Sequence, residues 1–240
     1  MNKNNKIWNN EVGQELYLKF LGTEYFDKNT GDTKRPLKAR TVKAIMEASV
    51  QNKDASIVSE MIEAQWASGG RVLFWSDQHF GHSNIIKYAN RKFNNVDEMN
   101  AAMMKNYRAH VKQDDIVVFG GDVSFGNLNS VKYELKSLPG RKVLVLGNHE
   151  IDRSGFRDHE AFEHVVMSLA LNYKGVEVSG NILVSHVPLM LDWLPKNTLN
   201  VHGHIHDELA GERRINMAVE HTDYTPKDLK DIFEINFSQM

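Results

Sequence analysis

Two histidines separated by a single residue, His204 and His206, are the first indication of chemistry in this chain. Val201 and Ile205 give their surroundings a β-strand pattern, so the pair is predicted to lie at a strand end. Side chains two residues apart in an extended segment point to the same side, and we expect both imidazoles to reach one small volume. Such a pair favours a metal site, although two surface histidines before an acidic loop would show the same pattern.

Other polar residues also follow short apolar runs. They are Asp77 and His79, Asp122, Asn148 and His149, and His186, in addition to His204 and His206. In an open α/β sheet, ligands bind at the carboxyl ends of the strands. Each residue alone would also fit a helix cap or a structural histidine. Their recurrence at five strand ends indicates one shared site.

The elements that must position these residues begin after Gly69 and Gly70, where short apolar runs alternate with helical patterns. Strands are predicted over 71–75, 116–119 and 142–146, and helices over 96–111 and 128–138. The run 162–169 has a less regular pattern, and a hairpin is predicted with strands 175–178 and 182–184 around a turn at 179–181. Strands separated by helices predict βαβ units and a largely parallel or mixed sheet.

Residues 1–70 have a different pattern, and we expect an N-terminal, mainly helical extension before a domain over 71–240. A turn is predicted at 29–32, and two amphipathic helices are predicted between Val42 and Ala67, interrupted around 52–54. A basic cluster spans residues 34–43. It fits a solvated helix face, or a surface that faces substrate or nucleic acid.

Composition narrows the chemistry. The chain has 240 residues, 41% of them hydrophobic, which is enough for a sizeable core. It has no cysteine, which excludes disulfides, thiolate metal sites and a cysteine nucleophile, so a metal would need His, Asp, Glu or Asn. The net charge of −2 gives no general basic field, so nucleic acid is a possible partner that net charge does not indicate.

Several protein classes are excluded or disfavoured by what the sequence lacks. It has no run of about eighteen apolar residues and no leader pattern, so we expect a cytoplasmic protein without membrane contact. The GxxxxGK phosphate loop and the GxSxG elbow are also missing, which excludes a P-loop NTPase and a serine hydrolase of the elbow type.

The ordered motifs resemble those of the calcineurin-like metallophosphoesterases. These motifs are DxH, GD, GNH(D/E), a single His and GHxH, present as Asp77-Gln78-His79, Gly121-Asp122, Gly147-Asn148-His149-Glu150, His186 and Gly203-His204-Ile205-His206. The resemblance covers residues 71 to about 235. FWSDQHFGHSNII, NNVDEMNAAMM and RINMAVEHTDYTP further resemble a small bacterial and bacteriophage branch. The implied fold is α/β, with two mixed β-sheets sandwiched and flanked by helices.

The resemblance also implies a centre of two divalent metal ions, bridged by Asp122. One ion would take Asp77, His79 and His206, and the other Asn148, His186 and His204. A shell rich in histidine favours Mn, Fe, Zn or similar ions. In such centres a metal-activated hydroxide attacks phosphorus, and His149 would protonate the leaving oxygen.

One position departs from the family pattern. Many relatives extend the second motif to GDxxD, whose last carboxylate orients the catalytic histidine, but this chain has Phe125 there. The partner of His149 is therefore open, with Glu150 and Asp152 as candidates. His82 either contacts the substrate phosphate or caps the next helix.

Four further residues are weaker candidates. His202 is expected behind the site or in the core. Arg153, Arg213 and Arg214 fit either phosphate contacts or solvated side chains.

The implied activity is hydrolysis of a phosphate ester, either a phosphodiester or a nucleotide phosphate. The alternatives are a phosphomonoesterase, a nucleotide pyrophosphohydrolase, a nuclease whose basic segment 34–43 borders the cleft, and a non-catalytic metal-bound interaction module. Specificity in such folds lies in loops and extensions, and neither the substrate nor the oligomeric state follows from the sequence.

Overall fold

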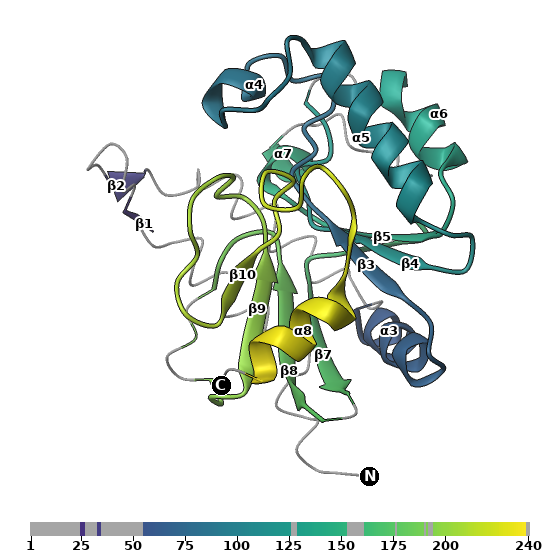
Figure 1. The fold of residues 1–240 in the computed structure, drawn as a ribbon, viewed down its shortest axis with the longest axis vertical. Coiled ribbons are helices and arrows are strands. Elements are labelled where there is room, and N and C mark those ends of the chain that lie inside the picture. The colour runs from purple at the N-terminus through teal and green to yellow at the C-terminus, as the bar shows by residue number, and fades with distance from the viewer. Residues whose placement is uncertain are drawn as a thin grey trace.

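Two β-sheets packed face to face form the centre of the molecule (Figure 1). The structure is a computed structural model, and it describes residues 25–26, 33–34, 55–125, 129–152, 161–175, 177–189, 191 and 194–238. One sheet has five strands in the order β11-β3-β4-β5-β6, and the other has four in the order β10-β9-β8-β7. Both sheets are mixed, which confirms the predicted fold class. The N-terminal extension lies mostly outside the described residues.

The five-stranded sheet contains the buried strands that the sequence predicts. Its parallel strands are β3 (Val72–Trp75), β4 (Ile116–Phe119), β5 (Arg141–Val145) and β6 (His164–Val166), and β11 (Lys227–Asp228) pairs antiparallel with β3. The strands β3 and β4 are apolar throughout because both faces of the sheet are covered.

The four-stranded sheet corrects the predicted hairpin. Its strands are β7 (Ser168–Lys174), β8 (Ser179–Ser185), β9 (Thr198–His202) and β10 (Arg214–Asn216). The chain reverses between β7 and β8, where the Gly175 N–H donates to Val178 O at 2.8 Å, so the turn predicted at 179–181 is wrong. Gly180 lies within β8. Only glycine fits there, because a Cβ at this position would overlap the Phe237 ring. This glycine is therefore explained by close packing against α8 and not by a turn.

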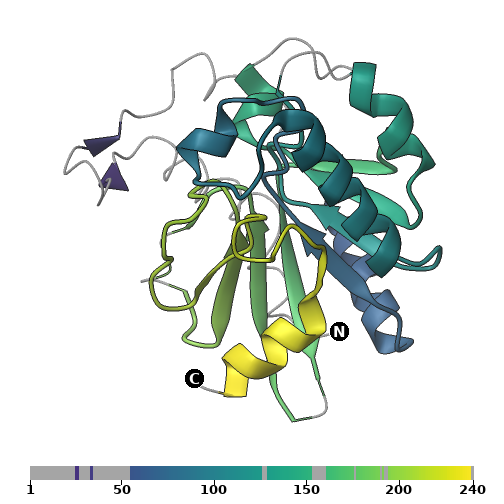
Figure 2. The same cartoon turned by 45° about the horizontal axis from the view of Figure 1, so that its top comes forward.

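Helices cover the outer face of the five-stranded sheet. They are α5 (Val96–His110) and α6 (Asn129–Ser137), which are linked by an ion pair between Arg108 and Glu134. Figure 2 shows both helices over this sheet, and the short helix α4 (Ile85–Tyr88) lies beyond its end. The Asn95 side chain caps α5 by accepting the Glu98 N–H. On its buried face, Met103 and Tyr107 join Trp75 and Phe119 in one apolar cluster. The predicted helices 96–111 and 128–138 are confirmed to within one residue at each end.

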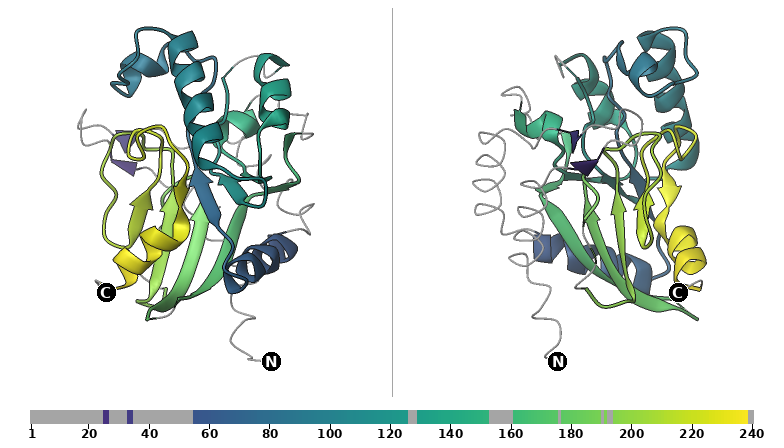
Figure 3. Two further views of the ribbon diagram at one scale, coloured as in Figure 1. Left: turned by 45° about the vertical axis from the view of Figure 1, so that its right-hand side comes forward. Right: turned by 90° about the vertical axis from the view of Figure 1, so that its left-hand side faces the viewer.

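A second apolar cluster fills the space between the sheets. Both α3 (Ala55–Ala67) and α8 (Leu229–Ser238) contribute to it, and they lie at the end of the molecule opposite α4 and α7 (Figure 3). Val58 and Ile62 of α3 are fully buried, which confirms the second predicted N-terminal helix. Helix α8 was not predicted, although Leu229, Phe233 and Phe237 recur at four-residue steps.

The N-terminal region is described only in part. Strands β1 (Tyr25–Phe26) and β2 (Thr33–Lys34) pair antiparallel. The turn predicted at 29–32, the first predicted helix and most of the basic segment 34–43 lie outside the described residues, and the domain boundary at residue 70 stays a prediction. Among the helices that are described, none has the length and apolarity needed to cross a membrane.

Candidate metal centre

Loops that leave five strands at their carboxyl ends converge on one edge of the sandwich. The β3 and β4 loops run alongside each other, since the Asp77 N–H donates to Gly121 O and the His79 N–H to Asp122 O, both at 3.0 Å. The loop after β5 opens into α7 (Asn148–Asp152), which begins with two of the predicted residues. The loops after β8 and β9 supply His186, His204 and His206.

The convergence forms three overlapping groups of side chains that offer metal-ligand atoms within 4.8 Å of one another. These groups are Asp77, His79 and His206; Asp122, His186 and His204; and His79, Asp122 and His149. Asp122 belongs to the second group and also approaches the first, because its Oδ2 is 3.4 Å from His186 Nε2 and 3.6 Å from His79 Nε2. The structure thus brings the predicted residues together, while their binding of metal stays a prediction.

The GHxH segment does not have the extended geometry expected from its spacing. Strand β9 ends at His202, and His204 and His206 have φ angles of 70° and 47°. The Ile205 N–H donates to Gly203 O at 2.8 Å in a tight turn. The rule that alternate residues share a side therefore does not apply beyond the strand, and each histidine joins a different group.

Left-handed backbone recurs across the site. Asp77, His79 and Asp122 have φ angles of 60°, 52° and 52°, in addition to the two histidines of the GHxH segment. For residues with a Cβ this conformation is uncommon, and such strain is found preferentially at functional sites. The strained residues coincide here with the side chains that converge.

The histidine nitrogens are arranged as metal ligands require. His186 Nδ1 donates to Gly120 O at 2.8 Å, which leaves Nε2 to face Asn148 Oδ1 at 3.1 Å and Asp122. His79 Nε2 is buried and has no hydrogen-bond partner among the described residues. A ligating histidine characteristically donates from its other nitrogen to a carbonyl or carboxylate. This donor set of imidazole, carboxylate and amide groups fits divalent transition metals.

Burial and the contacts among the converging side chains shift their pKa values. Burial raises the pKa of Asp77 and lowers that of His79 well below its usual value, which keeps His79 in the neutral form that binds metals. Burial opposes ionisation of Asp122, but nearby imidazoles, His186 foremost, hold its pKa well below the usual range. Burial likewise opposes protonation of His186, yet the Asp122 carboxylate raises its pKa to about 10.

His149 lies at the more open side of the centre, with 23% of its side chain exposed. Its backbone N–H donates to Asp122 Oδ1 at 2.9 Å. Its ring contacts Phe125, with centroids 5.3 Å apart, and His79, at 5.0 Å. Phe125, which stands in the sequence where the GDxxD pattern has its last carboxylate, therefore places an aromatic ring beside His149.

Glu150 supports the loops of the site. Its Oε2 accepts the backbone N–H groups of Asp122 and Gly147, and its Oε1 that of Val123, each at 2.8 Å. Burial and the Asp122 charge raise the pKa of Glu150 to about 7. These contacts give Glu150 a role in fixing the loops after β4 and β5. The Asp152 side chain lies outside the described residues.

His82 packs inside the rim of the site. Its ring stacks on Phe125, with centroids 3.7 Å apart and planes at 5°, and its Nδ1 lies 3.4 Å from His79 Nδ1. The side chain is buried, and its contact with substrate stays a prediction.

The weaker candidates that the structure describes have other contacts. His202 is buried at the end of β9, in line with the expected core position. Arg213 donates to Leu191 O at 2.8 Å and to Pro195 O at 3.2 Å, and Arg214 begins β10. Arg153 is not among the described residues.

Two charged residues lie behind the site without a clear signal in the sequence. Arg91 donates to Glu220 Oε1 at 2.8 Å through Nε, and His206 Nδ1 lies 3.2 Å from the same oxygen. Glu220 belongs to the quoted stretch RINMAVEHTDYTP, which was the one signal that pointed to it.

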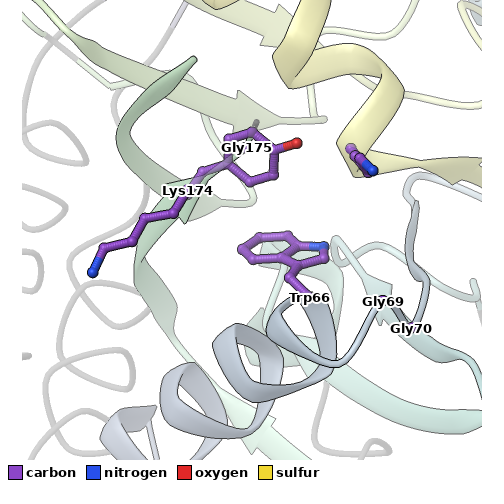
Figure 4. Close-up of a pocket in the computed structure, with 7 residues that line it drawn as sticks. Trp66, Gly69, Gly70, Lys174 and Gly175 are labelled. Carbon is purple, nitrogen blue, oxygen red and sulfur yellow. The ribbon is translucent and has the colours of Figure 1, made fainter. Parts of the chain in front are cut away.

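A separate cavity lies at the opposite end of β3. It is lined by Trp66, Gly69, Gly70, Tyr173, Lys174, Gly175 and Lys230, with Trp66 facing the turn at Lys174 and Gly175 (Figure 4). Its volume of about 220 Å³ is below the roughly 300–1,000 Å³ of typical ligand pockets. It contains none of the predicted site residues.

Comparison with known proteins agrees with this geometry. The family model for calcineurin-like phosphoesterases matches residues 70–237. An uncharacterized protein of Methanocaldococcus jannaschii is 31% identical over 175 residues, 69% of this chain and 90% of that protein. The Gene 66 protein of Mycobacterium phage L5 is 29% identical over 167 residues, 59% of this chain and 80% of its own length.

A solved structure has a similar fold. The crystal structure of a protein of unknown function from Aquifex aeolicus matches with a TM-score of 0.54 and 27% identity, over 69% of this chain and 98% of that one. The match to the family model over residues 70–237 confirms the resemblance found in the motifs. The chain belongs to the calcineurin-like phosphoesterase family.

Proposed function

We propose that this protein is a dinuclear-metal-dependent phosphoesterase that hydrolyses a phosphodiester or a nucleotide phosphate. The observation that supports this most directly is the position of Asp122 between two ligand groups, with His149 beside it. A carboxylate shared by two sets of ligands is what a two-metal site needs. A lone histidine cluster would not require it.

The ligand sets follow the two groups. Asp77, His79 and His206 would hold one ion, Asn148, His186 and His204 would hold the other, and Asp122 would contact both. Mn, Fe or Zn suits these donors. Bound there, the ions would polarise the phosphoryl group and supply an activated water as nucleophile.

The protein's own contribution to bond cleavage is assigned to His149. Its Nε2 is 3.7 Å from Asp122 Oδ2, and its partial exposure lets it meet a substrate that enters from solvent. From this position the imidazole would donate a proton to the leaving oxygen. A fixed proton donor beside the ligand groups favours an enzyme over a non-catalytic metal-binding module.

The direct test is hydrolysis of bis-p-nitrophenyl phosphate and p-nitrophenyl phosphate by chelator-stripped protein, before and after Mn²⁺ is added. Asp122→Asn removes the shared carboxylate charge. Asp97→Asn makes the same change at an exposed residue in the first turn of α5 and serves as the matched control. We expect metal-dependent diester hydrolysis that Asp122→Asn abolishes and Asp97→Asn leaves intact.

The outcomes separate the alternatives. Turnover of the monoester alone would replace the phosphodiesterase with a phosphatase. If two ions bind but neither ester nor a panel of nucleotides is cleaved, the non-catalytic module becomes the better description. Hydrolysis that survives chelation, or Asp122→Asn, would contradict the proposed centre.

A further inference from the structure

The guanidinium group of Arg91 is fully buried directly behind the loop that carries Asp77 and His79. Its side chain is 0% exposed. Nη2 donates to Asp77 O at 2.7 Å and Nη1 to Gln78 O at 2.8 Å. These two carbonyls belong to the peptide groups that join Asp77 to His79. Arg91 therefore holds the short segment between two candidate ligands.

The same guanidinium is paired with a buried carboxylate that contacts a third candidate ligand. Arg91 Nη2 lies 2.7 Å from Glu220 Oε1, and the Glu220 side chain is 6% exposed. His206 Nδ1 lies 3.2 Å from that oxygen. An imidazole that donates from Nδ1 to a carboxylate presents Nε2 for coordination, in a fixed orientation and with greater basicity.

The strained backbone of Asp77, His79 and His206 needs support from surrounding contacts. Asp77, His79 and His206 all have left-handed φ angles, of 60°, 52° and 47°. Conformations of this kind persist only where surrounding contacts over-determine them. Arg91 and Glu220 provide contacts of this kind, and they come from segments 129 residues apart.

The second ligand group is supported differently. There His186 Nδ1 faces the neutral carbonyl of Gly120 at 2.8 Å, with no charged pair behind it in the described contacts of that ring. We infer that Arg91 and Glu220 are positioning residues for the ion held by Asp77, His79 and His206, and that they set the affinity of this site separately from the other. The inference rests on the proposed metal centre.

The test is a metal titration. Binding of Mn²⁺ is measured by calorimetry, and binding of Co²⁺ is measured by its absorption spectrum. Glu220→Gln keeps the size of the side chain and removes its charge. Arg91→Lys keeps the charge but cannot span both carbonyls. The matched control is Glu134→Gln, which breaks a surface pair with Arg108 whose side chains are 44% and 47% exposed.

We expect two ions per chain in the wild type and in the control. In Glu220→Gln and Arg91→Lys one ion should bind about 10- to 100-fold more weakly while the other binds as before. Thermal unfolding of the metal-free variants sets a temperature at which each is folded, and the titrations are made there. A general loss of structure would weaken both ions together, so loss at one site alone identifies positioning.

The inference is overturned if both variants bind two ions with wild-type affinities, if both ions weaken equally in folded protein, or if the wild type binds none. A wild type that binds two ions but hydrolyses no ester contradicts the proposed function. In that case the titration still tests the roles of Arg91 and Glu220.

Discussion

The ring of Phe125 meets the ring of His149 at 62°, with centroids 5.3 Å apart. We expect this contact to orient the imidazole for proton donation. A ring contact is worth roughly 0.5–1.5 kcal/mol, so its loss in Phe125→Leu should lower kcat for ester hydrolysis by about 2- to 12-fold with little change in KM. Steady-state kinetics with the diester measures this. Phe125→Tyr keeps the ring and should retain most activity; equal losses in both variants would contradict an orienting role.

Proton donation by His149 should depend on the leaving group. An alkoxide needs a proton much more than p-nitrophenolate does, so His149→Ala should slow an alkyl ester by about 10²- to 10⁴-fold. The loss on p-nitrophenyl esters should be smaller. Parallel kinetics on methyl and p-nitrophenyl esters of one phosphate tests this, with metal content measured alongside. Equal losses on both substrates would show that His149 is no proton donor.

Metal binding should strengthen as the pH rises. The Asp122 carboxylate outweighs burial and raises the pKa of His186 to about 10, so we expect the metal-free site to hold a proton on His186 at neutral pH. A metal must displace that proton, and each proton released increases apparent affinity by about tenfold per pH unit. Mn²⁺ titrations between about pH 6 and pH 8, in buffers of different ionisation enthalpy, count the protons. An affinity that is flat with pH would contradict a protonated His186.

Glu150 should matter for stability. Glu150→Gln places an amide N–H₂ against a backbone N–H, at either the Val123 side or the side of Asp122 and Gly147. A buried donor without an acceptor costs about 1–3 kcal/mol, and loss of a buried charge whose pKa is raised to about 7 offsets part of that cost. The free energy of unfolding in urea should therefore fall by no more than about 3 kcal/mol.

The matched control for Glu150 is Glu163→Gln, in a half-exposed pair with Arg141. This surface change should cost less than about 1 kcal/mol. If the two variants unfold alike, Glu150 does not fix the loops.

Gly203 should tolerate no side chain. A Cβ at this position would overlap Asp77 Oδ2 and Ser76 Oγ, so Gly203→Ala should displace a candidate ligand and weaken metal binding by at least about tenfold. Gly211→Ala is the control, because its Cβ would meet only the end of the Arg214 side chain, at 3.3 Å. Wild-type titration curves for Gly203→Ala would exclude Asp77 as a ligand.

The sequence by itself identified the residues that converge and the family. Residue type and order carry this information: Asp77, Asp122 and His186 each follow an apolar run, and such runs form strands whose carboxyl ends meet. The central strands and α5 were also predictable because their apolar periodicity is local. The turn between β7 and β8 was not predictable, because Gly180 is required by its contact with Phe237 of α8, which lies far along the chain.

Only the tertiary structure decided how the site is divided and supported. His204 and His206 reach different groups because both leave the strand in left-handed conformations, which their spacing does not reveal. Phe125 became the neighbour of His149 through packing between loops. Arg91 and Glu220 are 129 residues apart. Glu220 lies in a stretch that resembles the family branch, but nothing in the sequence indicates that it contacts Arg91, because this contact exists only once the loops after β3 and β10 have folded against each other.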